Sequence, residues 1–439
     1  MSDTPYLKDV RQQYESLPYP PRDPVDEHRR LLPLFSGSLL VINHHCFRGK
    51  RDFRSGFRCL VAGGGTGDST IYLAEQLRST DAEVVYLDMS TASRQVAEAR
   101  AEVRGLTNIT WISASILELP DLGLGEFDYI ECGGVLHHLE STEAGLDALN
   151  SVLREDGAIF LMLYAKYGRQ SVYDMQALLR NYLPDGLSIA EKIGMTRKLL
   201  ATLPGSNSFQ RNIDTWKQEI DADGGGDAGL YDLLLHSQDR CFDVPGVYAL
   251  ARHAGLHLLG FAVRPDAYDP ANHVSAPGVR KYLATLDKPR RQALAEQLVG
   301  NILKHEFFLA RQPGGGARLD DDDIALCAYG PLRAKAIELS ASMVPAPGRM
   351  VSYDDGYNRL SLPCTQVTKL VLANMDGSTA VRSLRKRACR TLPGITPAIF
   401  DQELRDLFHL LHPRGIVYLI RAGDIGVRVP TYRGPAKAG

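Results

Sequence analysis

The sequence has neither a long hydrophobic run nor an excess of charge of one sign. No apolar stretch approaches the roughly 18 residues that a membrane-spanning helix needs, and the segment MSDTPYLKDVRQQYESLPYPPRDP has no apolar core of the signal-peptide kind. The 50 lysines and arginines nearly balance the 52 aspartates and glutamates. Composition therefore gives no sign of a nucleic-acid or membrane partner, and we expect a cytoplasmic protein.

Cysteines are few and scattered. The seven cysteines are odd in number and include no CxxC pair, which argues against a disulfide framework or a zinc site. His44 and His45 stand beside Cys46, but two adjacent histidines and one cysteine lack the spacing of a closed metal site. We therefore expect no metal. Tandem repeats are also missing.

What the sequence does contain is an alternation of apolar runs and helical patterns, in a chain too long for one ordinary core. Near-continuous apolar runs predict buried parallel strands, and amphipathic segments between them predict crossover helices. The predicted strands are 57–62, 83–88, 108–114, 127–133 and 157–164, and the helices are 68–79, 91–104 and 141–156. The fold class is α/β, a doubly wound sheet.

Beyond Tyr164 the pattern changes. Residues 170–235 read as a helical insertion, and 256–310 supply the sixth and seventh strands of the same sheet. A glycine-rich and then acidic linker, 311–323, precedes a C-terminal domain of short helices and a hairpin, which suggests a small α+β, winged-helix-like unit. The expected domains are an N-terminal arm or flap over the cofactor (1–56), a nucleotide-binding domain (57–315) and a linker with a C-terminal domain (316–439).

A glycine-rich turn follows the first predicted strand. Gly63, Gly65 and Gly67 give G-x-G-x-G, and Asp68 stands where a dinucleotide fingerprint needs its third glycine. A carboxylate at this helix N-terminus would repel a pyrophosphate, whereas it suits the ammonium of a methionine moiety. This favours S-adenosylmethionine (SAM) over NAD. The alternative is a tight turn that binds no ligand.

Asp88 ends the second predicted strand. A carboxylate at the carboxyl end of that strand can accept hydrogen bonds from both ribose hydroxyls. The alternative role for Asp88 is a helix N-cap.

Four stretches carry a resemblance to a known family. LVAGGGTG, VVYLDMS, SILELP and FDYIECGGVLHHLE, in that order over about residues 57–165, resemble the successive motifs of class I SAM-dependent methyltransferases. The resemblance implies a seven-stranded Rossmann-like methyltransferase sheet and SAM as the cofactor. The expected cofactor-binding residues are Gly63, Gly65, Gly67, Asp68, Asp88, Met89, Ser115, Ile116, Gly133 and Val135.

The chain departs from that family at two positions. Val61 stands where the family often has an acid that fixes the methionine ammonium, and Ser115 stands where an aspartate often contacts the adenine amine. We expect looser cofactor binding, or compensation by Asp68. YESLPYPPRDP and YAKYGRQSVYDMQALLR resemble a bacterial group related to the rickettsial protein lysine methyltransferases, which implies a C-terminal regulatory or substrate-handling domain.

Methyl transfer depends mainly on aligning the nucleophile and excluding water, so the catalytic candidates are positioning groups. They are His137, Tyr19 and Tyr164. Each has a structural alternative. His137 could be a histidine bonded to backbone, Tyr19 part of an arm packed on the surface, and Tyr164 a residue that packs at a strand end. His138 more simply reads as a backbone-bonded histidine, and His236 is a weaker candidate for reaching the cleft from the insertion.

The expected function is transfer of a methyl group to a protein or peptide side chain, lysine first. The alternatives are a small-molecule N-, O- or C-methyltransferase with the insertion as a lid, and a SAM-binding regulator without turnover. The long insertion also allows a homodimer.

The C-terminal domain is basic. Residues 359–439 hold thirteen basic and five acidic side chains, a surplus of about eight, concentrated in RSLRKRACR. Three interpretations remain open: a module that recruits a peptide or protein, a nucleic-acid-binding surface, or a solvated helix that pairs with the acidic linker Asp320–Asp323. No aromatic stacking pattern accompanies the charge, so nucleic acid ranks last.

Overall fold

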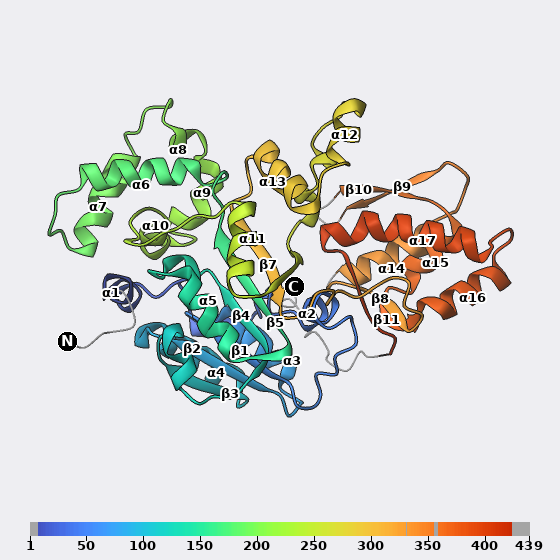
Figure 1. Cartoon of the computed structure of the whole chain (residues 1–439), viewed down its shortest axis with the longest axis horizontal. Coiled ribbons are helices and arrows are strands. Elements are labelled where there is room, and N and C mark those ends of the chain that lie inside the picture. The colour runs from blue at the N-terminus through green and yellow to red at the C-terminus, as the bar shows by residue number, and fades with distance from the viewer. Residues whose placement is uncertain (1–7, 331, 355–358, 424–439) are drawn as a thin grey trace, which may run out of the picture.

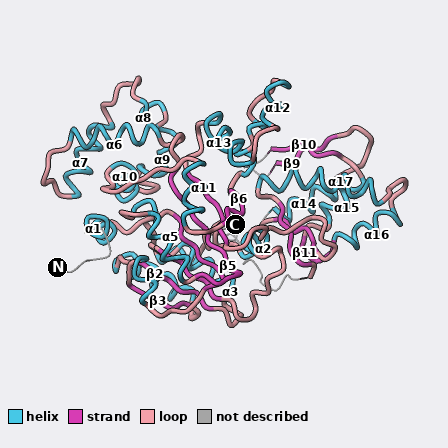
Figure 2. Tube along the Cα trace, viewed as in Figure 1, coloured by secondary structure: helices cyan, strands magenta, loops and turns pink. Residues whose placement is uncertain are grey.

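The computed structural model describes residues 8–330, 332–354 and 359–423, and its centre is a seven-stranded sheet between layers of helix. Strands lie in the middle, with helices on both faces and a second domain beside them (Figures 1 and 2). The strands are β1 (Arg58–Ala62), β2 (Glu83–Asp88), β3 (Ile109–Ser113), β4 (Phe127–Gly133), β5 (Leu153–Tyr164), β6 (His257–Phe261) and β7 (Lys304–Ala310).

The strand order is β3-β2-β1-β4-β5-β7-β6. The first five strands are parallel, and β7 lies antiparallel between β5 and β6. This confirms the doubly wound, seven-stranded prediction. The chain order reverses direction across the sheet between β1 and β4, so the cleft for a ligand opens beyond the carboxyl ends of these strands.

Both faces of the sheet are covered, which explains why its strands are apolar throughout. One layer packs around α5 and α11, and the other around α2 and α3. The helices of this part are α1 (Lys8–Ser16), α2 (Leu39–Cys46), α3 (Asp68–Leu77), α4 (Thr91–Arg104), α5 (Thr142–Ser151), α11 (Val244–His253), α12 (Pro277–Leu283) and α13 (Lys288–Val299).

Local signals explain where several helices begin and end. The side chain of Ser141 accepts the backbone N–H of Ala144 and caps α5, and Gly105 ends α4 in the left-handed conformation. The predicted helix 141–156 was too long, because the chain turns at Val152 and already enters β5 at Leu153. Helices α1 and α2, within the predicted arm, were missed.

The predicted helical insertion is present and has a small core of its own around Phe209 and Trp216. Figure 1 shows it above one end of the sheet, in green. Its helices are α6 (Gln170–Tyr182), α7 (Ile189–Leu200), α8 (Ser208–Arg211), α9 (Ile213–Ile220) and α10 (Gly226–Leu234).

The C-terminal domain has a separate core and two small sheets, β10-β9 and β11-β8-β12. The succession α15, β11, α16, α17, β12 is compatible with a winged helix, which remains a prediction. Its elements are β8 (Ile324–Ala328), α14 (Leu332–Ser342), β9 (Met350–Asp354), β10 (Arg359–Pro363), α15 (Gln366–Ala373), β11 (Asp376–Ala380), α16 (Val381–Thr391), α17 (Pro397–Leu411) and β12 (Val417–Arg421).

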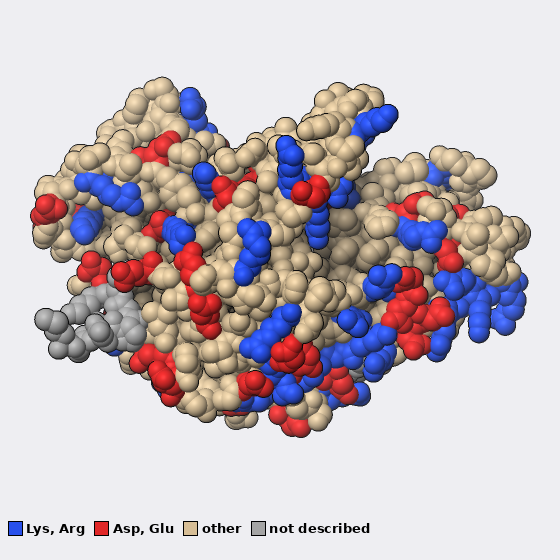
Figure 3. Space-filling model, viewed as in Figure 1, with Lys and Arg blue, Asp and Glu red and all other residues tan. Residues whose placement is uncertain are grey.

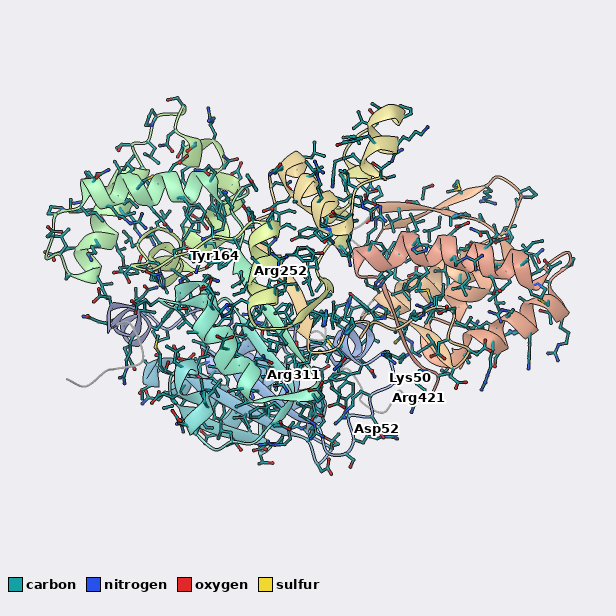
Figure 4. The ribbon with its side chains drawn as sticks, viewed as in Figure 1. Lys50, Asp52, Tyr164, Arg252, Arg311 and Arg421 are labelled. Atoms are coloured by element: carbon teal, nitrogen blue, oxygen red, sulfur yellow. The ribbon has the colours of Figure 1, made fainter. Side chains whose placement is uncertain are left out.

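The C-terminal domain packs directly on α2 of the first domain. The backbone N–H of Leu419 in β12 donates to Nδ1 of His44, 3.0 Å away, and the N–H of Arg421 donates to the carbonyl of Gly49, 2.6 Å away. Lys50 and Arg421 lie at this junction (Figure 4). The two domains are therefore joined by hydrogen bonds as well as by buried apolar side chains such as Tyr418.

Candidate functional site

The glycine-rich turn between β1 and α3 forms one wall of a cavity. Gly63 and Gly65 have φ values of 78° and 51°, which favour glycine. A Cβ atom on Gly63 would lie 2.4 Å from Cγ2 of Val135, so a side chain there would displace Val135 from the cavity wall. The turn therefore presents bare backbone to whatever the cavity holds.

Asp88 lies at the carboxyl end of β2, on the same wall. Its Oδ2 accepts the N–H of Gly65 and its Oδ1 accepts the N–H of Ser90, both at 2.8 Å. Burial raises the pKa of the Asp88 carboxyl. The N-cap of α4 is Ser90, whose hydroxyl accepts the N–H of Ser93, so the N-cap alternative for Asp88 was wrong. With the backbone of Met89 as a further donor, the Asp88 carboxylate still keeps acceptor capacity for a ligand.

The cavity has a volume of about 450 Å³, within the range of small-molecule sites. It brings together eleven of the thirteen site residues expected from the sequence. They are Tyr19, Gly63, Gly65, Asp68, Asp88, Met89, Ser115, Ile116, Gly133, Val135 and Tyr164.

The other two expected residues, Gly67 and His137, do not line the cavity. Gly67 is the N-cap of α3, where a Cβ atom would lie 2.8 Å from Cβ of Ala97, so its small size serves helix packing. His137 is completely buried, and burial holds the pKa of its imidazole well below the usual 6.5. The neighbouring His138 lines the cavity instead, and its Nδ1 lies 2.7 Å from the carbonyl oxygen of Gln238.

The N-terminal arm lies over the glycine turn. Arg22 binds the Asp68 carboxylate with two hydrogen bonds of 2.8 and 2.6 Å, and the buried Arg100 adds a third of 2.7 Å. The hydroxyl of Thr66 donates to the carbonyl of Pro20, 2.7 Å away. Burial acts to raise the pKa of Asp68, but these guanidinium groups outweigh it and lower the pKa. Asp68 thus lines the cavity with its negative charge already paired with Arg22 and Arg100.

The half of the cavity below the insertion has a different character. We call it the tyrosine chamber, and define it by Tyr14, Tyr19, Tyr164, Trp216, Glu219 and Asp232. Arm, sheet and insertion each contribute to it, and Tyr164 lies where β5 meets the insertion (Figure 4).

Hydrogen bonds join the tyrosine chamber's hydroxyls to its acids. Tyr14 and Tyr164 donate to the two oxygens of Asp232, at 2.9 and 3.2 Å, and Tyr19 donates to Glu219 at 2.5 Å. Burial raises the pKa of all three tyrosines, so their hydroxyls stay protonated.

Sequence reasoning missed the chamber's Trp216, Glu219 and Asp232. They belong to α9 and α10, and nothing in the sequence shows that these helices fold back over the strand ends. The one available signal was Asp232 itself, an acid inside the apolar run LYDLLL. A charged side chain on a buried helix face usually marks a paired or functional group.

Arg169 and His236 border the chamber. The Arg169 guanidinium carbon lies 3.5 Å from the centre of the Tyr164 ring. The ring of His236 stacks on His138 with centroids 3.8 Å apart. Ligand atoms of His138, Asp232 and His236 lie within 4.8 Å of one another, a spacing that could hold a metal. However, Nδ1 of His236 accepts the N–H of Gln238, which leaves the ring proton on Nε2, the nitrogen that faces Tyr14.

The basic surface of the C-terminal domain lies on α16, far from the cavity. Figure 3 shows basic side chains gathered at this end of the molecule. Arg382 pairs with Asp323 of the linker and Arg385 with Asp322, as one of the three interpretations expected. Lys386, Arg387 and Arg390 remain exposed. Part of the counted basic surplus, including Lys437, lies outside the described residues.

Residues 60–159, from β1 into β5, match the family model of a methyltransferase domain. The structure of PKMT2 from Rickettsia typhi in complex with AdoHcy matches with a TM-score of 0.65 at 16% identity, over 88% of this chain and 76% of that one. The chain contains a class I SAM-dependent methyltransferase domain.

Two curated proteins are also similar to this chain. An uncharacterized protein of Synechococcus sp. is 34% identical over 266 residues, which is 58% of this chain and 60% of that protein. The ubiquinone/menaquinone biosynthesis C-methyltransferase UbiE of Shewanella oneidensis is 28% identical over 128 residues, 28% of this chain and 49% of that protein. The matches thus span about half to 60% of these relatives' length. Among the described residues, every helix is too short or too polar to cross a bilayer.

Proposed function

We propose that the protein transfers a methyl group from SAM to an amine of a protein or peptide, with the lysine side chain as the first candidate acceptor. The observation that carries the proposal is the two-part cavity. One half is built of glycine backbone and the Asp88 carboxylate, and the other half is the acid-containing tyrosine chamber. PKMT2 of Rickettsia typhi, which shares the fold, was solved with S-adenosylhomocysteine (AdoHcy), the product that SAM leaves after methyl transfer.

In this proposal, each part of the cofactor lies at the end of a different strand. Ser115 and Ile116, after β3, border the adenine position, Asp88 after β2 accepts the ribose hydroxyls, and the open backbone at Gly63 and Gly65 leaves room for the methionyl chain. The residues fit the group, because Asp88 has acceptor capacity left over and the turn bears no side chains that would fill the space. Bound SAM supplies an electrophilic methyl group on a positively charged sulfur.

The tyrosine chamber suits a cationic acceptor. Glu219 and Asp232 attract an ammonium group, and the rings of Tyr14, Tyr19 and Trp216 offer faces for its alkyl chain and charge. An ammonium must lose a proton before it can attack, and Asp232, bonded to two tyrosine hydroxyls, is a carboxylate placed to accept it.

Alignment is the main contribution of the protein to rate. The arm, held down by the Arg22–Asp68 pair, and helices α9 and α10 enclose the cavity and exclude water. Fixing donor and acceptor in line in such a site supplies about 7–11 kcal/mol of the barrier in well-oriented systems.

A small-molecule acceptor is the second candidate. Its support is Arg169, a cation at the edge of the chamber that would bind the carboxylate of a metabolite, and the likeness to UbiE, named as a ubiquinone/menaquinone biosynthesis C-methyltransferase. In this alternative the insertion acts as a lid.

The test is to incubate the purified protein with methyl-labelled SAM and an extract of cells that lack the protein. A protein acceptor places the label in a macromolecular band, and a small-molecule acceptor places it in the soluble fraction. Label that remains in SAM, with no AdoHcy formed, would contradict an enzymatic role and indicate a binding protein.

A further inference from the structure

A buried carboxylate lies in the floor of the cavity. Glu131, near the carboxyl end of β4, is 6% exposed and lines the cavity. Its Oε1 accepts the hydroxyl of Ser36 at 3.1 Å. Among the described residues no lysine, arginine or histidine pairs with it, and the neighbouring charge is Glu306, of the same sign. A buried carboxylate in this state is costly, which is why such groups usually meet a cation.

Glu131 stands beside Val61, one of the two positions where the chain lacks an acid that the family often has. Strands β1 and β4 are parallel neighbours, and their register places Val61 opposite Glu131. Paired positions of neighbouring strands project their side chains to the same face, about 5 Å apart. The carboxylate missing at Val61 is therefore present one strand away, on the same face of the sheet and at the same height.

The order of the strands predicts which part of SAM lies there. Moving along β3, β2, β1 and β4, the proposed adenine position follows β3 and the proposed ribose position follows β2. A bound SAM molecule extended along these strand ends places its methionyl group over β1 and β4. The cationic end of that group is its α-ammonium.

We propose that Glu131 is the residue that anchors the α-ammonium of SAM, replacing from β4 the acid that β1 lacks at Val61. This rests on the proposed use of SAM. Burial raises the pKa of Glu131 to about 7, as expected for a carboxylate whose cationic partner arrives only with the ligand. Asp68, the compensating acid expected from the sequence, already pairs with Arg22 and Arg100.

The surroundings of Glu131 hold its carboxylate toward the cavity. Ser36 precedes α2 and Ser69 lies in the first turn of α3, and both hydroxyls bond it. A Cβ atom on Gly133 would lie 2.8 Å from Oε1 of Glu131, so glycine at 133 leaves the space that the carboxylate occupies.

The experiment compares ligands that differ in the ammonium. Calorimetry of the full-length protein measures the affinity of AdoHcy, which carries the α-ammonium, and of 5′-methylthioadenosine, which has the same nucleoside and sulfur without it. We expect Glu131→Gln to weaken AdoHcy about tenfold to a hundredfold, the effect of one charge-assisted contact. Methylthioadenosine affinity is expected to stay within about twofold of wild type, and Glu131→Asp to recover part of the AdoHcy affinity.

The possible outcomes separate the explanations. Equal losses for both ligands would mean that Glu131 only supports the structure, and unchanged AdoHcy affinity would overturn the proposal outright. If Asp68→Asn, and not Glu131→Gln, shows the ammonium-selective loss, Asp68 is the anchor and the proposal is wrong. If the wild-type protein binds AdoHcy, the proposed function is retained in all these cases. If the wild-type protein binds neither ligand, the proposed function and the proposed role of Glu131 are both wrong.

Should Glu131→Gln unfold the protein, Glu131→Asp provides the second route. The shorter side chain keeps the negative charge and withdraws the carboxylate from the ligand, so it is expected to weaken AdoHcy selectively, by less than Glu131→Gln would. Thermal unfolding without ligand shows whether either variant is folded.

Discussion

Nε2 of His44 in α2 lies 3.3 Å from Nε2 of His412, at the end of α17, across the junction of the two domains. The N–H of Leu419 donates to Nδ1 of His44, and Nδ1 of His412 faces the carbonyl of Val417, 3.0 Å away. The proton on Nε2 of His44 therefore donates to His412. Neither ring has a place for a second proton, so the junction requires both histidines to be neutral.

This arrangement predicts that the domain junction weakens in acid. Burial and the neighbouring histidines hold the pKa of His44 well below 6.5, burial lowers the pKa of His412, and burial with His412 lowers the pKa of His45 to about 3. A lowered pKa in the folded state means that the unfolded chain binds more protons, so stability is lost as pH falls below about 6.5, by up to about 1.4 kcal/mol per pH unit for each group.

Thermal unfolding between pH 8 and 5 measures this effect. His412→Phe removes one titrating ring and leaves the Nε2 proton of His44 without an acceptor. It is expected to be less stable than wild type at pH 8, by about 1–3 kcal/mol, and to lose less stability than wild type on acidification. Parallel curves for the two proteins would contradict the role of this pair.

Cofactor affinity is expected to depend on pH through Glu131. The carboxylate binds an ammonium only when it is ionised, and its raised pKa of about 7 places the change near neutrality. AdoHcy affinity should therefore fall as pH decreases from 7.5 to 6, by at most about tenfold per pH unit. Glu131→Gln should show a flat profile over the same range. Equal slopes for wild type and variant would assign the titration to another group.

The tyrosine chamber predicts a selective effect on the acceptor. Asp232→Asn and Glu219→Gln each remove one negative charge from it. Either change should raise the KM for an amine acceptor by about tenfold or more and leave AdoHcy affinity within about twofold of wild type. Asp214→Asn, on the exposed side of helix α9, which also carries Glu219, is the matched control and should change neither quantity. If the chamber variants lose AdoHcy affinity, the cofactor contacts the tyrosine chamber, and the proposed division of the cavity is wrong.

The arm over the glycine turn can be released by one substitution. Arg22→Ala removes the bidentate bond to Asp68 and should weaken AdoHcy binding by about threefold to tenfold and expose residues 8–30 to limited proteolysis. Arg30→Ala removes an exposed ion pair with Asp26 in the same arm and serves as the control. Identical proteolysis of the two variants would show that the Arg22 pair does not hold the arm.

The sheet was predictable because its signals are local. Each strand is an apolar run, and the glycine turn and Asp88 follow the first two runs at fixed spacing, so chain order alone places them at neighbouring strand ends. The boundary between α5 and β5 was missed because Leu153 fits a helix and a buried strand equally well.

The rest of the site depends on contacts between distant segments. In the sequence, Glu131 is a polar residue in an apolar strand. Only the register of β1 and β4 shows that it lies next to Val61. Trp216 and Asp232 enter the cavity because α9 and α10 fold over the strand ends. Whether His137 or His138 faces the cavity depends on the direction of one short helical turn, Leu136–His138. A pattern of apolar residues does not predict that direction.

Calorimetry of AdoHcy with wild type and Asp88→Ala is the most direct test of the SAM site. The wild-type protein should bind, and loss of two charge-assisted bonds to the ribose should reduce affinity by about a hundredfold or more, with the folded state retained by circular dichroism. A wild-type protein that ignores AdoHcy at millimolar concentration, or an Asp88→Ala variant that binds as tightly as wild type, would contradict the account.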